Sequence, residues 1–124
     1  MSKRFFLSLV GVFFMQFLVF AYAGDLSESI REIIENPIYY DGKDVVVEGE
    51  VEKIKFTESY DGDPYTLFKL YDDENNSVGV YFKGRLSITE GDKVKVFGEF
   101  KKEKRYAIFK FRNVIKAKRV EDIG

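Results

Sequence analysis

The chain has 124 residues, and its 20 basic and 21 acidic side chains leave a formal net charge of −1. It contains no cysteine and no histidine. These absences exclude disulfides, Cys/His zinc sites, His-ligated haem, cysteine nucleophiles and triads that use imidazole. We expect no catalytic residue, no metal and no cofactor. The net charge alone does not indicate affinity for nucleic acid.

The N-terminal segment has the pattern of a secretory signal. Lys3 and Arg4 precede a long uncharged apolar run that ends in Ala21-Tyr22-Ala23, a small-residue cleavage pattern. This order predicts a signal peptide over residues 1–23. The alternative is an uncleaved N-terminal anchor, because residues 5–23 are long enough to cross a thinner bilayer. In either case the positively charged N-terminus stays on the cytoplasmic side of the membrane. We expect a periplasmic or secreted protein, or one held by a membrane anchor and facing outside.

Residues 24–124 are expected to form one domain, because this length supports a single core. The segment has no Gln and is rich in Glu and Lys, a composition associated with hyperthermophiles. It opens with apolar residues at helical spacing, namely Leu26, Ile30, Ile33 and Ile34. With Asp25 and Glu28 as a capping pair, they predict a helix over 26–35 whose isoleucines close one end of the fold.

The apolar period then changes to two, which predicts five strands. They cover Asp44–Phe56, Tyr65–Tyr71, Ser77–Lys83, Lys93–Phe100 and Arg105–Val120. Gly49, inside the first strand, predicts a bulge or sharp bend that lets one strand serve two sheets. Polar turns are expected at 72–76 and at 101–104. The spacing leaves no room for crossover helices, so a closed antiparallel barrel is the economical fold, because it removes exposed edges.

Four pieces of the chain resemble, in order and spacing, the OB-fold of the anticodon-binding, nucleic-acid-binding type. They are Val47–Val51, Phe68–Asp72, Val78–Phe82 and Gly91–Gly98. The resemblance implies an all-β protein, a five-stranded antiparallel OB-fold barrel with a short N-terminal helix. Proteins with this fold bind oligonucleotides, oligosaccharides, peptides or proteins, so the resemblance names no ligand.

The chain also resembles two exported groups of OB-fold proteins. Its apolar N-terminus and the run Val80–Leu86 are similar to the membrane-anchored haem chaperone of cytochrome c maturation, but the haem-attaching His is absent. Its size and expected export are similar to those of small periplasmic bacterial OB-fold proteins. The second likeness implies a binding module without catalytic residues.

Alternation in the second and third strands predicts a ligand-binding face. If Phe68, Leu70, Val78, Val80 and Phe82 point inward, five polar or aromatic residues point outward: Tyr65, Lys69, Tyr71, Tyr81 and Lys83. Tyr rings with interleaved Lys can stack bases and meet phosphates. We add Arg85 to this face and place Lys110 and Arg112 on its flank. The alternative is that Tyr is a good strand residue and that Lys protects strand edges.

The charges are split along the chain. Residues 101–119 carry nine basic side chains against Glu103, whereas residues 24–52 carry nine acids against Arg31 and Lys43. The basic segment either meets an anionic partner or pairs internally with the acidic first strand, its expected neighbour in the barrel.

A short motif resembles part of an enzyme site. Asp61-Gly62-Asp63 followed by Thr66 is similar to a calcium-dependent motif of thermonuclease-like OB-fold enzymes. The family's Arg and its later acidic element are not matched, so the phosphate would lack its electrostatic clamp. An Asp- and Gly-rich turn is the ordinary explanation.

Together these observations predict a non-enzymatic, exported OB-fold binding module of the cell envelope. Its expected ligand is a peptide, a protein or another envelope component. The alternative is a single-stranded nucleic acid. Membrane contact is expected only through residues 5–23, if they are retained.

Overall fold

The structure is a computed structural model that describes residues 27–106 and 108–124. The expected signal peptide or anchor, residues 1–23, lies outside this part of the chain, and so does the first residue of the predicted helix. In the described ranges, no helix is both long enough and apolar enough to span a bilayer.

Two short helices precede the strands, α2 (Ile30–Glu35) and α3 (Pro37–Tyr40). The prediction began α2 too early. Its N-cap is Ser29, whose Oγ accepts a hydrogen bond from the backbone N–H of Glu32 at 2.9 Å. Ile30 and Ile33 are buried in the main core and Ile34 packs against it, which confirms the expected burial of the isoleucines.

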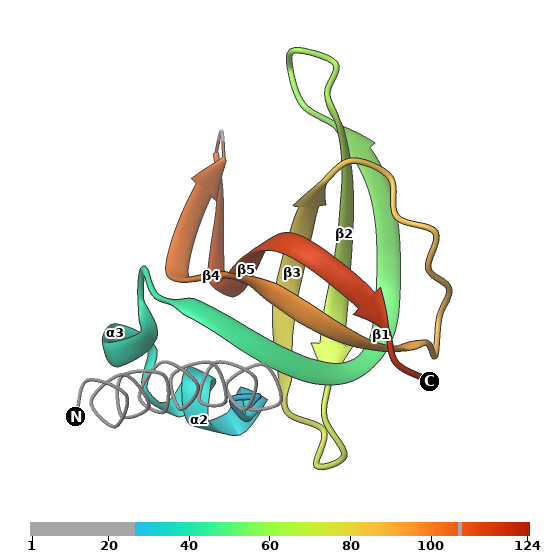
Figure 1. Cartoon of the computed structure of the whole chain (residues 1–124). Helices are drawn as coiled ribbons and strands as arrows, with labels where there is room; N and C mark the ends of the chain where they lie inside the picture. Colours follow the sequence, from blue (N-terminus) through green and yellow to red (C-terminus); the bar gives the residue numbers. More distant parts are fainter. Residues whose placement is uncertain (1–26, 107) are drawn as a thin grey trace, which may run out of the picture.

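Five strands follow and close into a barrel in the order β1-β2-β3-β5-β4. Their bounds are β1 Asp44–Glu58, β2 Pro64–Tyr71, β3 Ser77–Lys83, β4 Lys93–Tyr106 and β5 Phe109–Asp122 (Figure 1). The expectation of a purely antiparallel barrel is wrong at one place, because β3 and β5 run parallel. An odd number of strands in a closed ring cannot alternate direction throughout, so one pairing must be parallel.

The long first strand serves two partners, as expected. Its first half pairs with β4 and its second half with β2. The bulge lies at Lys53, which has a φ of 58°, and not at Gly49. The Glu90 carboxylate accepts the backbone N–H groups of Lys53 and Ile54 at 3.1 and 2.9 Å. Gly49 instead permits close approach, since a Cβ there would lie 2.6 Å from the carbonyl oxygen of Tyr71.

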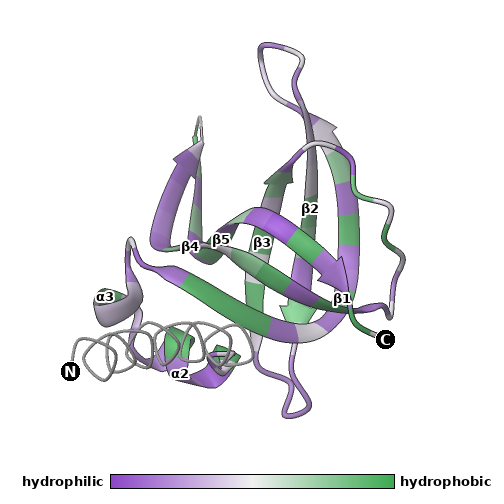
Figure 2. Cartoon of the chain, in the orientation of Figure 1, coloured by the Kyte–Doolittle hydropathy of each residue, from purple (hydrophilic) through white to green (hydrophobic). Residues whose placement is uncertain are grey.

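The core follows the predicted alternation of β2 and β3. Phe68, Leu70, Val78 and Val80 are buried, and Phe82 packs against them. Figure 2 shows the same alternation as short green and purple segments along the strands. One polar side chain, Thr66, is also buried. Its hydroxyl donates to the Gly84 carbonyl at 2.7 Å and accepts the Leu86 N–H at 3.0 Å.

The β4–β5 hairpin is longer than predicted and extends past the barrel. Residues 101–104, expected as the connection, belong to β4, and the strands run on to Tyr106 and from Phe109. β4 leaves its pairing with β1 after Glu99, and β5 joins β3 only at Val114. We call residues 103–106 and 109–112 the arm; it rises beside β3 in Figure 1. Most of its side chains are exposed, so no inward-facing apolar pattern marks it in the sequence.

Candidate functional site

The outer face of β2 and β3 carries the side chains that alternation placed there. Tyr65 lies opposite Lys83, Leu67 opposite Tyr81 and Lys69 opposite Gly79. Tyr65 and Tyr81 are therefore diagonal neighbours on one face, within reach of each other's rings. The β1–β2 loop and the arm lie at the edges of this face.

Tyr81 is half-buried on this face. Its hydroxyl is closed off from solvent and has no hydrogen-bond partner among the described residues. Burial raises the pKa of Tyr81, and the charge of Glu99 and the nearby Tyr65 raise it further. The Lys104 Nζ, from the arm, lies 6.0 Å from the centre of the Tyr81 ring. The arm thus reaches over the outer face of β3.

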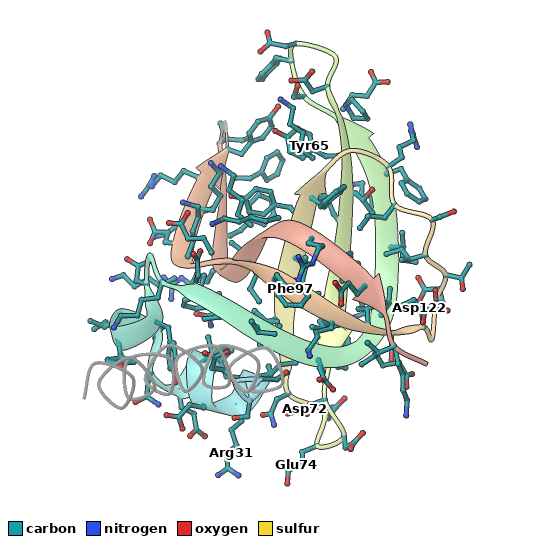
Figure 3. All side chains as sticks on the ribbon, viewed as in Figure 1. Arg31, Tyr65, Asp72, Glu74, Phe97 and Asp122 are labelled. Atoms are coloured by element: carbon teal, nitrogen blue, oxygen red, sulfur yellow. The ribbon has the colours of Figure 1, made fainter. Side chains whose placement is uncertain are left out.

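The arm and the β1–β2 loop also meet through aromatic rings. Tyr60 of the loop stacks on Tyr106 of the arm, with ring centroids 6.0 Å apart and planes 25° apart. In β5, Phe111 lies directly opposite Lys104. Figure 3 shows rings gathered between the arm and β3 on the side where Tyr65 is labelled. We call this set the aromatic surface: Tyr60, Tyr65, Tyr81, Tyr106 and Phe111.

Cations border the aromatic surface. Lys104 lies over Tyr81, and Lys116 lies beside Tyr81 in the parallel pairing of β3 and β5. Lys83 is nearby, but its ammonium pairs with the Asp63 carboxylate of the β1–β2 loop at 3.5 Å. Flat rings with adjacent ammonium groups can stack planar ligands and hold anionic groups at the same time.

Lys110 and Arg112 lie on the other face of the arm. Residues directly opposite each other in an antiparallel pair share a face, and successive residues alternate. Arg112 is opposite Glu103 and Lys110 is opposite Arg105, one position out of phase with Lys104. Burial would raise the pKa of Glu103, but Lys110 and Arg105, at 3.4 and 3.3 Å, lower it overall. These two predicted residues flank the site without joining it.

Tyr71 lies at the opposite, acidic end of the face. It lines an open hollow with Glu48, Glu50, Glu52, Asp72 and Asp73. Lys69 stands between the two ends, opposite Glu52 of β1. Arg85 lies beside β1, with its guanidinium 5.3 Å from the centre of the Phe56 ring. The predicted set therefore splits, and Tyr65 and Tyr81 are the members that the structure brings together with the arm.

The predicted set of site residues does not include Tyr60, Lys104, Tyr106, Phe111 or Lys116. The expected turn at 101–104 placed Lys104 outside any strand. With strands that run to Tyr106 and from Phe109, alternation would have put Lys104 and Tyr106 on one face with Phe111. No local pattern signals the contact between Tyr60 and Tyr106, because it joins the β1–β2 loop to the distant end of β4.

The expected pairing of the basic last strand with the acidic first strand is wrong. β4 lies between them, so β5 pairs with β4 and β3. One ion pair bridges the gap, between the Lys118 ammonium and the Asp44 carboxylate at 3.0 Å. In the arm, the Glu103 carboxylate pairs with Arg105 and Lys110, and Arg112 lies opposite Glu103.

Asp61-Gly62-Asp63 forms a turn, as the ordinary explanation required. Gly62 has a φ of 86°, and the Ser59 N–H donates to the Asp63 carbonyl at 2.8 Å. Within residues 27–106 and 108–124, no group of three or more potential ligands is placed to hold a metal ion.

No known protein family matches the chain, and no curated protein is similar to it in sequence. Among solved structures, the chain is similar to a small single-stranded DNA-binding protein from Streptomyces coelicolor. The TM-score is 0.53 at 21% identity, and the match covers 67% of this chain and 94% of that one. With the strand order of the closed sheet, this likeness shows that the chain has an OB-fold.

Proposed function

We propose that this protein binds single-stranded nucleic acid on the aromatic surface. The observation that carries the proposal is the meeting of the β1–β2 loop and the arm beside the outer face of β2 and β3. In OB-folds, ligands bind on this face between these two loops. Here the position holds stacked and neighbouring rings, bordered by Lys104 and Lys116.

The charge distribution supports an anionic ligand despite the small net charge. The arm carries Lys104, Arg105, Lys110 and Arg112 against Glu103, whereas the carboxylates of β1 lie around the hollow beside Tyr71. An extended anion would therefore be attracted to one end of the face and repelled from the other. Stacking on Tyr or Phe tolerates any base, so the proposed binding has little sequence preference.

The likeness to a single-stranded DNA-binding protein favours this function over an envelope peptide or protein as ligand. The envelope interpretation gains no support from the comparisons. A non-enzymatic role agrees with the kind of protein that the structural likeness names. Export of the chain stays a prediction.

Two tyrosines on one strand provide a matched test. Tyr65 and Tyr71 both project from the outer face of β2 and are half-buried, but only Tyr65 belongs to the aromatic surface. A stacked base contributes roughly 1–3 kcal/mol, so Tyr65→Ala is expected to weaken binding about 5- to 150-fold. Tyr71→Ala is expected to leave affinity unchanged.

The measurement is the fluorescence anisotropy of a labelled oligothymidylate, titrated with the full chain and each variant at low salt. Circular dichroism checks that both variants remain folded. Equal losses of oligonucleotide affinity in Tyr65→Ala and Tyr71→Ala would mean that the aromatic surface is not the specific binding site. Absence of binding by the unsubstituted protein would refute the proposed function.

A further inference from the structure

The end of the arm exposes large apolar side chains far from the core. Ile108, between β4 and β5, is 92% exposed, and Phe109, the first residue of β5, is 59% exposed. Single exposed apolar residues are common, but two adjacent ones at the end of a projecting hairpin form a local apolar point. We call Ile108 and Phe109 the tip. Ile108 cannot stack on a base, so the proposed nucleic-acid function does not explain it.

Cations surround the tip. Lys104, Arg105, Lys110 and Arg112 all lie within four residues of Ile108, and Glu103 is the one acid in the arm. The other strongly exposed isoleucine, Ile38 of α3, has a different setting: Glu35 and Asp41 are its charged neighbours within three residues. Lys43 also lies near α3, with its ammonium 3.4 Å from the centre of the Tyr39 ring, but acids flank Ile38 on both sides in the sequence. Within the described residues, the arm is where a strongly exposed isoleucine has four cations within four residues.

We propose that the tip inserts into the surface of an anionic phospholipid bilayer while the four cations of the collar meet lipid phosphates. Apolar side chains beside Lys and Arg are what an anionic membrane interface binds, through burial of apolar area and electrostatic attraction together. The extended arm holds the tip away from the barrel, so insertion needs no unfolding of the core.

A second copy of the chain is a poorer occupant of the tip. Two tips in contact would bring two basic collars together, and like charges across an interface are unfavourable. A lipid phosphate layer has the complementary sign. This membrane contact is not part of the proposed function. It is also distinct from the membrane contact expected through residues 5–23. Contact of the tip with lipid and binding of nucleic acid share Lys104 and the face of the arm that carries Phe109, whose ring centroid lies 6.4 Å from that of Phe111. Ile108, Arg105, Lys110 and Arg112 lie outside the aromatic surface.

The chain lacks tryptophan, so a single introduced indole reports its own surroundings without background. The full-length Ile108→Trp protein is mixed with vesicles of phosphatidylcholine alone, or with vesicles that also contain phosphatidylglycerol. Ile38→Trp is the matched control, since Ile38 is 80% exposed and lies outside the arm. Because the readout is local, attachment through the N-terminal segment does not imitate insertion of the tip.

With phosphatidylglycerol present, we expect the emission of the indole at 108 to move to shorter wavelength and to be quenched by lipids brominated on their acyl chains. The indole at 38 should show neither change. Adding Lys110→Gln and Arg112→Gln to the Ile108→Trp protein should weaken its affinity for vesicles that contain phosphatidylglycerol. The expected loss is roughly fivefold per removed cation. The proposed function is tested separately by the oligonucleotide affinity of Tyr65→Ala, because that substitution leaves the tip and the collar intact.

Three outcomes would overturn the proposal. One is an emission from position 108 that is the same with and without anionic lipid. Another is an equal shift at position 38. The third is a shift at 108 that grows with protein concentration in the absence of vesicles, which would assign the tip to a second copy of the chain.

Discussion

Tyr81 combines a packing role and a proposed binding role in one side chain. Its ring lies on the outer face of β3 beside Tyr65 and below Lys104, while its hydroxyl is buried without a partner among the described residues. A buried hydroxyl that makes no hydrogen bond costs about 1–3 kcal/mol relative to one that is paired. The ring is thus useful to the proposed site and the hydroxyl is not.

Tyr81→Phe is therefore expected to leave the free energy of unfolding unchanged, or to raise it by up to about 1 kcal/mol. Oligonucleotide affinity should be retained because the ring remains. Urea unfolding measures the free energy of unfolding, and fluorescence anisotropy measures the oligonucleotide affinity.

The raised pKa of Tyr81 also makes the stability of the protein depend on pH. The folded pKa exceeds the ordinary value of 10.0, so the wild type loses stability as pH rises above 10, and Tyr81→Phe should lose less. A loss of more than about 1 kcal/mol at neutral pH would show that the hydroxyl is paired.

At the scale of elements, the β4–β5 hairpin depends on close approach of its two backbones at Gly98. The register shifts between Phe97 and Gly98. A Cβ at Gly98 would lie 2.2 Å from the carbonyl oxygen of Lys116 and 2.8 Å from the Ala117 Cα. These are backbone atoms of a paired strand, which cannot move aside without breaking the ladder.

Gly98→Ala is expected to destabilise the protein by about 1–3 kcal/mol or more, because the substitution overpacks a backbone contact. The midpoint of urea unfolding measures the effect. Gly79→Ala is the graded control: its nearest neighbour would be a Val114 methyl group at 3.1 Å, which can shift, so a smaller loss is expected. Equal stability of Gly98→Ala and the wild type would mean that β4 and β5 are not in this register.

At the scale of the whole molecule, the separation of charge decides where an anion can bind. The carboxylates of β1 border the hollow beside Tyr71, and the arm presents cations at the other end of the same face. Binding of a nucleic acid releases counterions, so the affinity falls as salt rises, with a slope set by the number of neutralised phosphates.

Lys104→Gln should therefore reduce the slope of log K against log salt by about 0.7, the value for one phosphate contact on a single strand. Lys118→Gln serves as the control, because the Lys118 ammonium already pairs with Asp44 at 3.0 Å and lies outside the arm. Oligonucleotide titrations at four or more salt concentrations give both slopes. An unchanged slope in Lys104→Gln would remove Lys104 from the proposed interface.

The sequence by itself determined the features that depend on local period and composition. The inward sets of β2 and β3, the turn at 72–76 and the buried isoleucines of α2 follow from spacing along a single strand or helix. These patterns are readable because each faces the core on one side and solvent on the other. The same alternation placed Tyr65 and Tyr81 on one outer face before any contact between them was visible.

Only the tertiary structure decided which of the outward residues act together. The parallel β3–β5 pairing follows from closing a ring of five strands, a long-range condition that no segment expresses alone. The arm extends past the barrel and so loses the one-sided burial that marks a strand in sequence. Its contacts with Tyr60 and Tyr81 join residues more than twenty positions apart, and charge separates Tyr65 from Tyr71 along one strand. Sequence period is a local property, whereas these contacts depend on bulges, closure and the direction of a projecting hairpin.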